Sequence, residues 1–287
     1  MALKLTLLGF LVYAVMAFYA AAAVLYWARR RRAGGGLYAL GCAAAIVTFG
    51  VRWYQVNHVP LQNLFEVCLC LGMLMWPITL FSRRFLGVAS EGGDAIIGFI
   101  ILLPAGFVFK AEPQHLPPAL QSALFIPHVA SYMLAYVVMA KAAVQALATF
   151  APALKPGPDE FLDDRVLRAV AAPFSPAAAS AARLAREHGA YRLAALGFPL
   201  LTLGLVLGAV WGKIAWGDYW NWDPKELWSL VSWLVYLGYF HFRYMYGQRF
   251  PRVNSAIVLV GLLVIILTLL WVNLANLFKG GMHSYAS

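Results

Sequence analysis

The chain has 287 residues, of which 62% are hydrophobic and only 12% are charged, and its mean hydropathy is +0.72. An ordinary soluble domain is about half apolar and roughly a quarter charged. This composition excludes a water-soluble globule, a disordered chain, a collagen and a disulfide scaffold. It predicts an all-α membrane protein whose helices cross the bilayer several times.

Apolar runs of about 20 residues recur along the chain, and such runs can cross the hydrocarbon layer as helices. They predict a bundle of about eight transmembrane helices at about 5–27, 37–54, 63–81, 95–110, 122–149, 191–211, 227–246 and 254–277. The first run continues to Trp27 and its cations follow it, which is typical of a retained anchor rather than a cleaved signal peptide. We therefore expect residues 1–287 to form one integral membrane domain.

The Lys and Arg residues are distributed unequally between the two ends of these helices. Fifteen of the 22 lie on one side, within 29–32, 83–84, 155–192 and 243–252, and six lie on the other. Cytoplasmic loops carry the excess of Lys and Arg, so we expect both termini on the outer side of the cytoplasmic membrane. Lys141 lies within a predicted span, where its side chain can snorkel inward. The net charge of +10 thus orients the chain and does not indicate a nucleic-acid partner.

Three features of the spans and their connections predict structure rather than chemistry. The polar segment at about 151–190 is expected to be a cytoplasmic loop containing a surface helix. Gly204, Gly208 and Gly212 recur at intervals of four on the sixth span, which allows another backbone to approach closely. The cysteines lie in apolar runs without metal-ligand spacing and are expected to be small buried residues: Cys42, Cys68 and Cys70.

The segment 212–226, expected outside the membrane, is unusually rich in tryptophan. Four tryptophans lie within 13 residues, at Trp216, Trp220, Trp222 and Trp228. An aromatic belt at the membrane interface accounts for isolated tryptophans. This density exceeds what one helix end requires, and it predicts an amphipathic shelf for a large flat ligand.

The end of the same segment also predicts a helix start. Asp223 as N-cap, Pro224 at the first helical position and Glu226 at the third would form an acidic capping box. Capping is the expected direct role of the Asp223 carboxylate, and a sharp helix start would also fix the direction of the neighbouring tryptophans.

Two histidines share the outer face with the tryptophan-rich segment. His128 lies at the start of the fifth span, and His283 lies just beyond the eighth. Two imidazoles beside an aromatic shelf predict axial ligation of a haem, whose iron takes ligands on both sides of the macrocycle.

The remaining histidines are expected elsewhere. His241 lies 18 residues after Asp223, roughly 27 Å along a helix, so it is expected near the cytoplasmic end of its span. It is either a snorkelling residue or a ligand, and a bis-histidine site there would need an imidazole from another subunit. His58, His115 and His188 are expected in loops.

The segment 216–226 resembles the tryptophan-rich WWD signature of the haem-handling proteins of cytochrome c biogenesis. Its Asp-Pro-Lys-Glu ending is similar to the CcsA (ResC) branch of the system II pathway. Shorter matches at 58–66, 127–132, 239–243 and 283–285 extend the resemblance from about residue 50 to the C-terminus.

This resemblance implies that the chain carries haem b across the membrane and presents it to an apocytochrome c with a Cys-x-x-Cys-His segment. It implies a membrane partner of the CcsB (ResB) type, which supplies the second inner imidazole and completes a holocytochrome c synthase, or haem lyase. In this family the tryptophan-rich loop and one histidine pair hold external haem, and a further histidine holds haem within the membrane. The residues so implied are Trp216, Trp220, Trp222, Asp223, His128, His283 and His241.

Other functions fit parts of the sequence. A secondary transporter or ion channel would use His241 and Lys141, although the spans show neither matched broken helices nor a ladder of intramembrane acids. A non-catalytic assembly scaffold and a system I type of haem-handling protein are also compatible with it. A Soret band in the purified protein separates the haem-handling functions from the rest.

The distribution of cations predicts the result of a topology experiment. Reporter fusions after Ser287 should be active only outside the cytoplasm, and fusions within 160–185 should be active only inside it. The opposite result at either position would contradict the predicted orientation and the assignment of the histidines to membrane faces.

Overall fold

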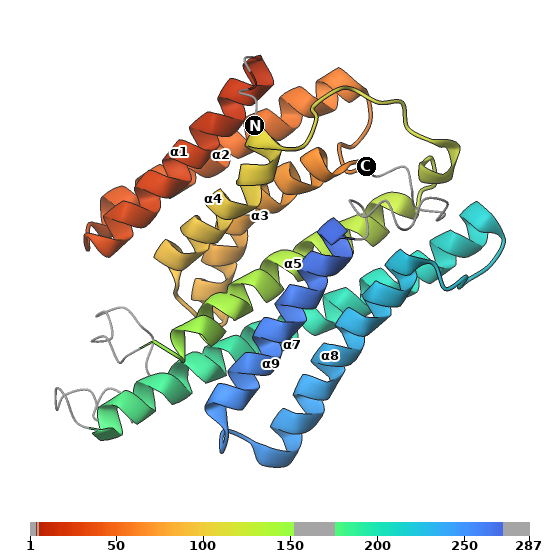
Figure 1. The fold of residues 1–287 in the computed structure, drawn as a ribbon. Helices are drawn as coiled ribbons and strands as arrows, with labels where there is room; N and C mark the ends of the chain where they lie inside the picture. Colours follow the sequence, from red (N-terminus) through yellow and green to blue (C-terminus); the bar gives the residue numbers. More distant parts are fainter. Residues whose placement is uncertain (1–3, 5, 152–175, 272–287) are drawn as a thin grey trace.

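The computed structural model describes residues 4, 6–151 and 176–271, and this part of the chain is helical without strands (Figure 1). The predicted all-α class is confirmed. A 3-10 turn lies at Pro118–Leu120, and a π-helical turn at Leu267–Trp271 follows the last helix. The helices are α1 (Leu7–Trp27), α2 (Arg31–Val56), α3 (Leu64–Phe85), α4 (Glu91–Phe107), α5 (Phe125–Ala148), α7 (Pro176–Trp216), α8 (Pro224–Tyr246) and α9 (Pro251–Ile266).

Each predicted span overlaps one of these helices. Six are long and apolar enough to cross a membrane: α1, α2, α3, α5, residues Ser180–Trp216 of α7, and Pro251–Leu270. α4 has only 17 residues and α8 is less apolar, so the crossing of these two stays a prediction.

Two boundaries differ from the predicted ones. α7 already begins at Pro176, so the last part of the predicted 151–190 loop is helical and His188 lies on a helix rather than in a loop. With 41 residues α7 is roughly 60 Å long, about twice the hydrocarbon thickness, so it can extend beyond the bilayer. The non-helical part of the tryptophan-rich segment is only 217–223, and residues 152–175 of the polar loop lie outside the described part of the chain.

The helices form two groups that meet along α5 (Figure 1). α1 to α4 pack against one another, and α5, α7, α8 and α9 form the second group. α5 packs along α7 and also contacts α3 and α4 of the first group. Its apolar window is 78% buried, more than that of any other candidate span, so α5 is the central helix of the described part.

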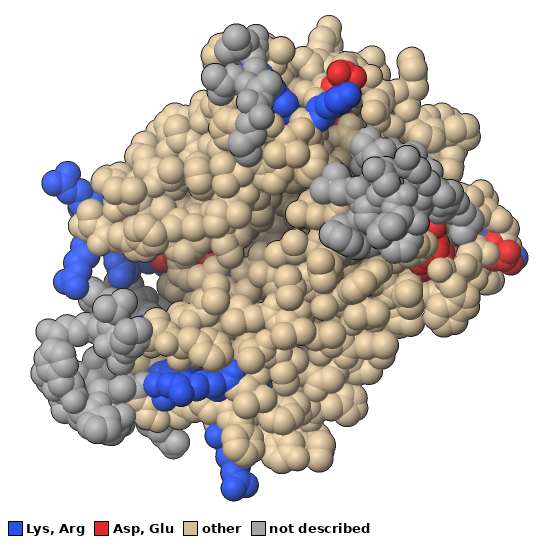
Figure 2. Space-filling model, in the orientation of Figure 1, with Lys and Arg blue, Asp and Glu red and all other residues tan. Residues whose placement is uncertain are grey.

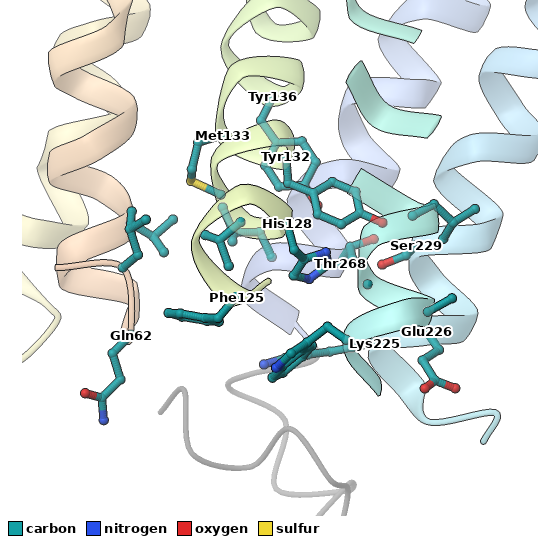
Figure 3. Close-up of a pocket in the computed structure, with 18 of the residues that line it drawn as sticks. Gln62, Phe125, His128, Tyr132, Met133, Tyr136, Lys225, Glu226, Ser229 and Thr268 are labelled. Carbon is teal, nitrogen blue, oxygen red and sulfur yellow. The ribbon is translucent and has the colours of Figure 1, made fainter. Parts of the chain in front are cut away.

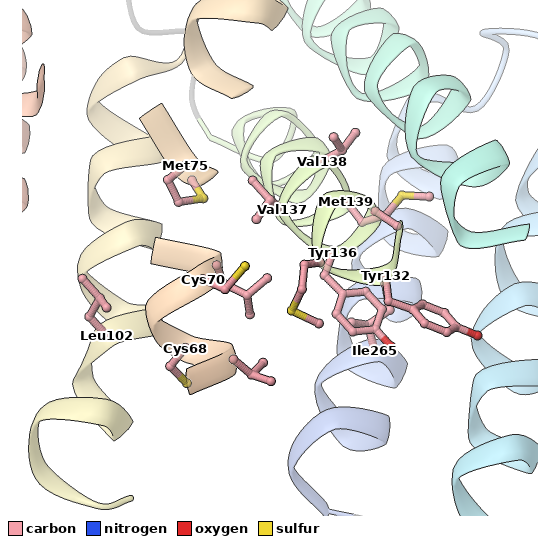
Figure 4. Close-up of a cluster of buried hydrophobic side chains, with 14 of the residues drawn as sticks. Cys68, Cys70, Met75, Leu102, Tyr132, Tyr136, Val137, Val138, Met139 and Ile265 are labelled. Carbon is pink, nitrogen blue, oxygen red and sulfur yellow. The ribbon is translucent and has the colours of Figure 1, made fainter. Parts of the chain in front are cut away.

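A cluster of buried side chains fills the junction between the two groups (Figure 4). Cys68 and Cys70 on α3 lie on the side of the junction opposite Tyr136 and Val137 on α5. In a membrane such packing stabilises helix association chiefly by dispersion contacts, since the lipid is as apolar as the core. All three cysteines are buried and free, so the predicted burial of these residues is confirmed.

A buried ion pair crosses from α4 to α5 in the same junction. The Asp94 carboxylate and the Lys141 ammonium are in direct contact, and both side chains are fully buried. Ser90 and Thr79 donate further hydrogen bonds to Asp94, at 2.8 and 2.9 Å. The expectation that Lys141 snorkels toward the cytoplasm is wrong, because a carboxylate lies within its reach inside the bundle.

A second buried pair fixes the opposite end of the bundle. Arg52 on α2 donates from Nε to Oε1 of Glu66 on α3 at 2.9 Å, and both side chains are buried. The same guanidinium donates to the carbonyl oxygens of Ala111 and Glu112 at 2.6 and 3.1 Å. Asn63 caps α3 by accepting from the backbone N–H of Glu66. This network anchors the segment between α4 and α5 to the start of α3.

The exposed cations follow the ends of the helices. On the face shown in Figure 2 most of the surface is uncharged, and Lys and Arg lie at its left and lower edges and, beside acidic residues, at its top. The left and lower edges correspond to the α1–α2 and α8–α9 turns in Figure 1. The starts of α3, α5 and α8 lie at the other end of the bundle.

The buried pair between α4 and α5 predicts a strong asymmetry between single and double substitutions. Asp94→Ala should lower the free energy of unfolding by about 3–5 kcal/mol, because it leaves the buried Lys141 ammonium without its carboxylate. The double change Asp94→Leu with Lys141→Met should recover most of this loss. Unfolding in mixed micelles measures both.

The exposed pair of Arg83 and Glu91 provides the control. Because Arg83 is 53% exposed, Arg83→Ala should change the unfolding free energy by less than about 1 kcal/mol. A double variant as unstable as Asp94→Ala alone would contradict the charge-based explanation.

Candidate functional site

A pocket opens where the start of α3 meets α5, the end of α7 and the start of α8 (Figure 3). Its cavity volume is about 170 Å³, and the pocket is open at its mouth. Pockets for small molecules and cofactors span roughly 300–1,000 Å³, so a large ligand would be only partly enclosed and would extend through the mouth. Most lining side chains are apolar or aromatic. The polar ones labelled in Figure 3 are Gln62, His128, Tyr132, Lys225, Glu226, Ser229 and Thr268.

His128, on the first turn of α5, lies in the wall of this pocket. Its Nδ1 lies 2.8 Å from the carbonyl oxygen of Gly204 on α7, and because a carbonyl only accepts, Nδ1 donates the proton. The lone pair of the neutral imidazole is therefore on Nε2, the nitrogen that a metal can bind. The ring stacks on Trp211 at 5.6 Å between centroids and meets Tyr132 edge-on at 5.2 Å. These contacts fix the orientation of the imidazole.

Glycines on α7 provide the space for these rings. A Cβ atom on Gly208 would lie 2.5 Å from Cε1 of His128, and one on Gly204 would lie 3.0 Å from the Tyr132 ring. We predicted the approach of another backbone at these glycines, and the neighbours are instead aromatic side chains of α5. His128 and Tyr132 are four residues apart and therefore project from the same face of their helix.

Only some of the tryptophans expected to form the shelf line the pocket. Trp211 is buried and donates from Nε1 to the carbonyl oxygen of Ala119 at 3.0 Å. Trp216 meets Trp211 at 4.8 Å, and Trp216 and Trp220 both line the pocket. Trp222 is 68% exposed and is not among the lining residues, although its ring meets that of Trp220 at 5.9 Å.

The predicted acidic capping box at the start of α8 is confirmed. Asp223 accepts from the backbone N–H of Lys225 at 3.0 Å, and Glu226 accepts from the backbone N–H of Asp223 at 3.2 Å. Pro224 occupies the first turn, as expected. Trp222 precedes the cap in the left-handed region with φ of 57°, which turns the chain sharply into the helix. The cap thus sets where the loop tryptophans lie relative to the pocket.

Lys225 is the cationic residue of the pocket wall. Its side chain is mostly buried, and burial lowers the pKa of Lys225 from 10.5 to about 8, while the nearby Asp223 carboxylate opposes that shift. The Glu226 carboxylate in the same wall already accepts from the backbone N–H groups of Asn221 and Asp223, so the Lys225 ammonium favours a ligand that carries acidic groups. We did not predict a role for either Lys225 or Tyr132. For Tyr132 the sequence did contain a signal, namely its four-residue spacing from His128, which places both side chains on one face of a helix.

The other histidines lie away from this pocket. His241 is exposed on α8, with Nδ1 donating to a backbone carbonyl one turn earlier at 2.9 Å. His58 contacts backbone oxygens of the outer loops, His115 is exposed, and His188 on α7 accepts from Arg192 Nε at 3.1 Å. His283 lies outside the residues that the structure describes.

The donor set of the pocket suits a metal complex that brings its own equatorial ligands. Within residues 4, 6–151 and 176–271, no three His, Cys, Asp or Glu side chains cluster closely enough to hold a metal ion. A metalloporphyrin needs only axial ligands and a flat apolar contact surface. The oriented His128 imidazole supplies one axial nitrogen, and the tryptophans that line the pocket, Trp211, Trp216 and Trp220, supply apolar ring surface.

Comparisons with known proteins match most of the chain. The family model described as cytochrome C assembly protein matches residues 36–278. The cytochrome c biogenesis protein CcsA of Synechococcus sp. (strain CC9605) is 33% identical over 255 residues, covering 82% of this chain and 80% of the relative. The protein of the same name from Mesostigma viride is 29% identical over 250 residues, with the same coverage.

One solved structure shares the fold. The cytochrome c haem lyase CcmF superposes with a TM-score of 0.60 at 17% sequence identity, and the match covers 94% of this chain and 48% of the lyase chain. This chain therefore spans about half the length of that lyase. At this identity the likeness shows a common fold alone.

The contact between α5 and α7 predicts opposite effects for two glycine substitutions. Gly208→Ala should lower the melting temperature, because the new methyl group would displace a His128 ring that is already held by Gly204 and Trp211. Gly238→Ala on α8 should raise stability by roughly 0.5–1 kcal/mol, because its Cβ meets no atom within 4 Å and alanine favours the helix. Thermal unfolding in detergent measures both, and a Gly208→Ala protein as stable as Gly238→Ala would contradict the close contact.

Proposed function

Because this chain belongs to the cytochrome c assembly protein family, as its tryptophan-rich segment predicted, we propose that it carries haem and presents it for attachment to apocytochrome c. The observation that carries this proposal is the oriented His128 imidazole in an aromatic pocket whose open mouth would let a macrocycle extend beyond it. The pocket opens at the end of the bundle opposite the Arg-rich turns, which supports a place on the outer side of the cytoplasmic membrane.

The residues of this chain would hold and orient the haem while the apocytochrome supplies the reacting thiols. Nε2 of His128 would ligate one face of the iron, and His283 would ligate the other. Trp216 and Trp220 would cover the macrocycle and exclude water, and Lys225 would face its acidic edge. In the attachment step each cysteine S–H adds across one haem vinyl group, so that a C–S bond forms, the proton goes to the other vinyl carbon and nothing leaves. The lyase activity therefore requires positioning of thiol and vinyl rather than a dedicated acid or base.

The inner end of α8 supports a second haem contact that is completed by another subunit. His241 is exposed, and since its Nδ1 donates to Leu237, its Nε2 carries the lone pair and faces away from the helix backbone. A membrane partner of the CcsB (ResB) type would supply the second imidazole. We infer that haem b enters at His241 and moves to the His128 pocket, and that the two subunits together form the holocytochrome c synthase.

An ion-conducting transporter is less well supported. That function required Lys141 to line a pathway, and its ammonium is buried against Asp94 at a helix junction. A scaffold without a ligand would not need an oriented imidazole in an open aromatic pocket.

Replacement of His128 tests the proposed ligation. Substitutions of residues that contact a metal ligand lower metal affinity or activity by roughly 10- to 100-fold. Because His128→Gly removes the ligand itself, it should reduce haem in the outer pocket by more than this. It should also abolish cytochrome c maturation, and added imidazole should restore part of it by occupying the vacated axial position. The Soret absorbance of the purified protein and the yield of holocytochrome c measure these effects.

His115→Gly is the matched control, since that imidazole is exposed in the same outer region. It should leave both readouts unchanged. A His128→Gly protein with normal maturation would show that His128 is not a ligand, and wild-type protein that never acquires a Soret band would contradict haem handling altogether.

A further inference from the structure

The rotation of α8 about its own axis decides which of its residues face the bundle and which face outward. Successive residues of an α-helix are about 100° apart, so residues 241 and 243 project in nearly opposite directions. Tyr236, Tyr239 and Arg243 share the inward face, and both tyrosines are fully buried. His241 lies on the outward face and is exposed. Whatever holds Arg243 inward therefore directs His241 outward.

Arg243 is held by one buried carboxylate on α7. Its Nε lies 2.7 Å from Oε1 of Glu187 and its Nη2 lies 3.3 Å from Oε2, which is the two-pronged geometry that fixes a guanidinium in the plane of a carboxylate. The guanidinium also lies 4.7 Å from the centre of the Tyr191 ring. The Glu187 side chain is 1% exposed, so water offers it little solvation.

The same carboxylate binds the chain on both sides of the α8–α9 turn. Gln248 donates to Oε2 of Glu187 at 2.7 Å, and Asn254 on α9 donates to Oε1 at 2.9 Å. Asn254 also donates to the carbonyl oxygen of Gly247 at 2.9 Å. Glu187 thus joins α7, the end of α8, the turn and α9 at one point.

The buried pair of Glu187 and Arg243 constrains how the helices are arranged. Replacing both partners of such a pair with apolar residues is often neutral or stabilising, whereas removing one partner is destabilising, so the pair favours the arrangement in which both partners meet. In this protein the pair selects one rotation of the last turns of α8. His241 lies on these turns, two residues before Arg243.

We propose that Glu187 is a positioning residue that sets the direction of His241, so that its imidazole faces the inner haem and the partner subunit. This inference rests on the proposed function of His241 as a haem ligand. Without Glu187, the Arg243 guanidinium would seek solvent, and the end of α8 would sample several rotations. The inner haem would then lack a fixed axial ligand, while the His128 pocket at the other end of the helix would be unaffected.

Haem content tests the proposal in the membrane complex purified through a tag on this chain. In a His128→Gly background, where only inner haem should remain, adding Glu187→Ala should lower the Soret absorbance per chain by about tenfold or more, the lower bound for changes next to a metal ligand. Glu187→Asp, which keeps the charge, should restore most of it. Glu91→Ala removes a carboxylate from a pair with a largely exposed arginine and should change nothing.

A distance measurement tests the direction of residue 241 independently of haem. Spin labels on cysteines introduced at His241 and at Val253, which is 44% exposed on α9, should give one narrow distance distribution. The native cysteines are buried and should not react. Glu187→Ala should broaden this distribution, and Glu91→Ala should leave it narrow.

The two readouts separate the proposal from the proposed function. A narrow distribution in Glu187→Ala, or a broad one with undiminished inner haem, would overturn the positioning role. Normal inner haem in His241→Ala would instead contradict ligation by His241, and the haem-directed part of this inference would fail with it.

Discussion

The close packing of α5 on α7 is the contact on which the rest of the structure depends. Gly204 and Gly208 leave space for the rings of His128 and Tyr132, and the carbonyl of Gly204 orients the imidazole through Nδ1. The same helix α5 is the most buried candidate span and joins the two helix groups. Small residues at a helix interface in membranes permit this approach, and dispersion contacts then stabilise it. The proposed ligand is therefore placed by the element that holds the bundle together, which gives it the rigidity that an axial ligand needs.

Buried charges tie the ends of the helices at three places in the described part of the chain. Arg52 with Glu66 joins α2 and α3 to the loop after α4, Lys141 with Asp94 joins α5 to α4, and Arg243 with Glu187 joins α8 to α7. A charge without a partner is costly in hydrocarbon, so each pair constrains which helices can be neighbours and in which rotation. The net gain in stability from such pairs is small, because desolvation offsets most of the attraction. Their effect is to exclude competing arrangements of apolar helices that would otherwise pack about equally well.

α8 connects the two ends of the proposed haem pathway. Its first turn is fixed by the Asp223 capping box beside the outer pocket, and its last turns are fixed by the contact of Arg243 with Glu187. Its 23 residues extend roughly 35 Å, which is close to the thickness of the hydrocarbon layer. One rigid helix therefore relates the tryptophans at its start to His241 near its end. This supports transfer of haem between two sites whose separation is set by helix length, with a partner subunit completing the inner one.

The sequence by itself determined the features that depend on local pattern. Hydropathy predicted a helix at each of eight positions, Asp-Pro-Lys-Glu predicted the capping box, and the tryptophan-rich segment predicted the family. Only the tertiary structure decided which residues meet: Lys141 and Asp94 are 47 positions apart, His128 and Gly204 are 76 apart, and Arg243 and Glu187 are 56 apart. The exposure of Trp222 and the pocket role of Lys225 were decided in the same way. The physical reason is that capping and hydropathy act within a few residues of one helix, whereas side-chain partners depend on how each helix is rotated against its neighbours.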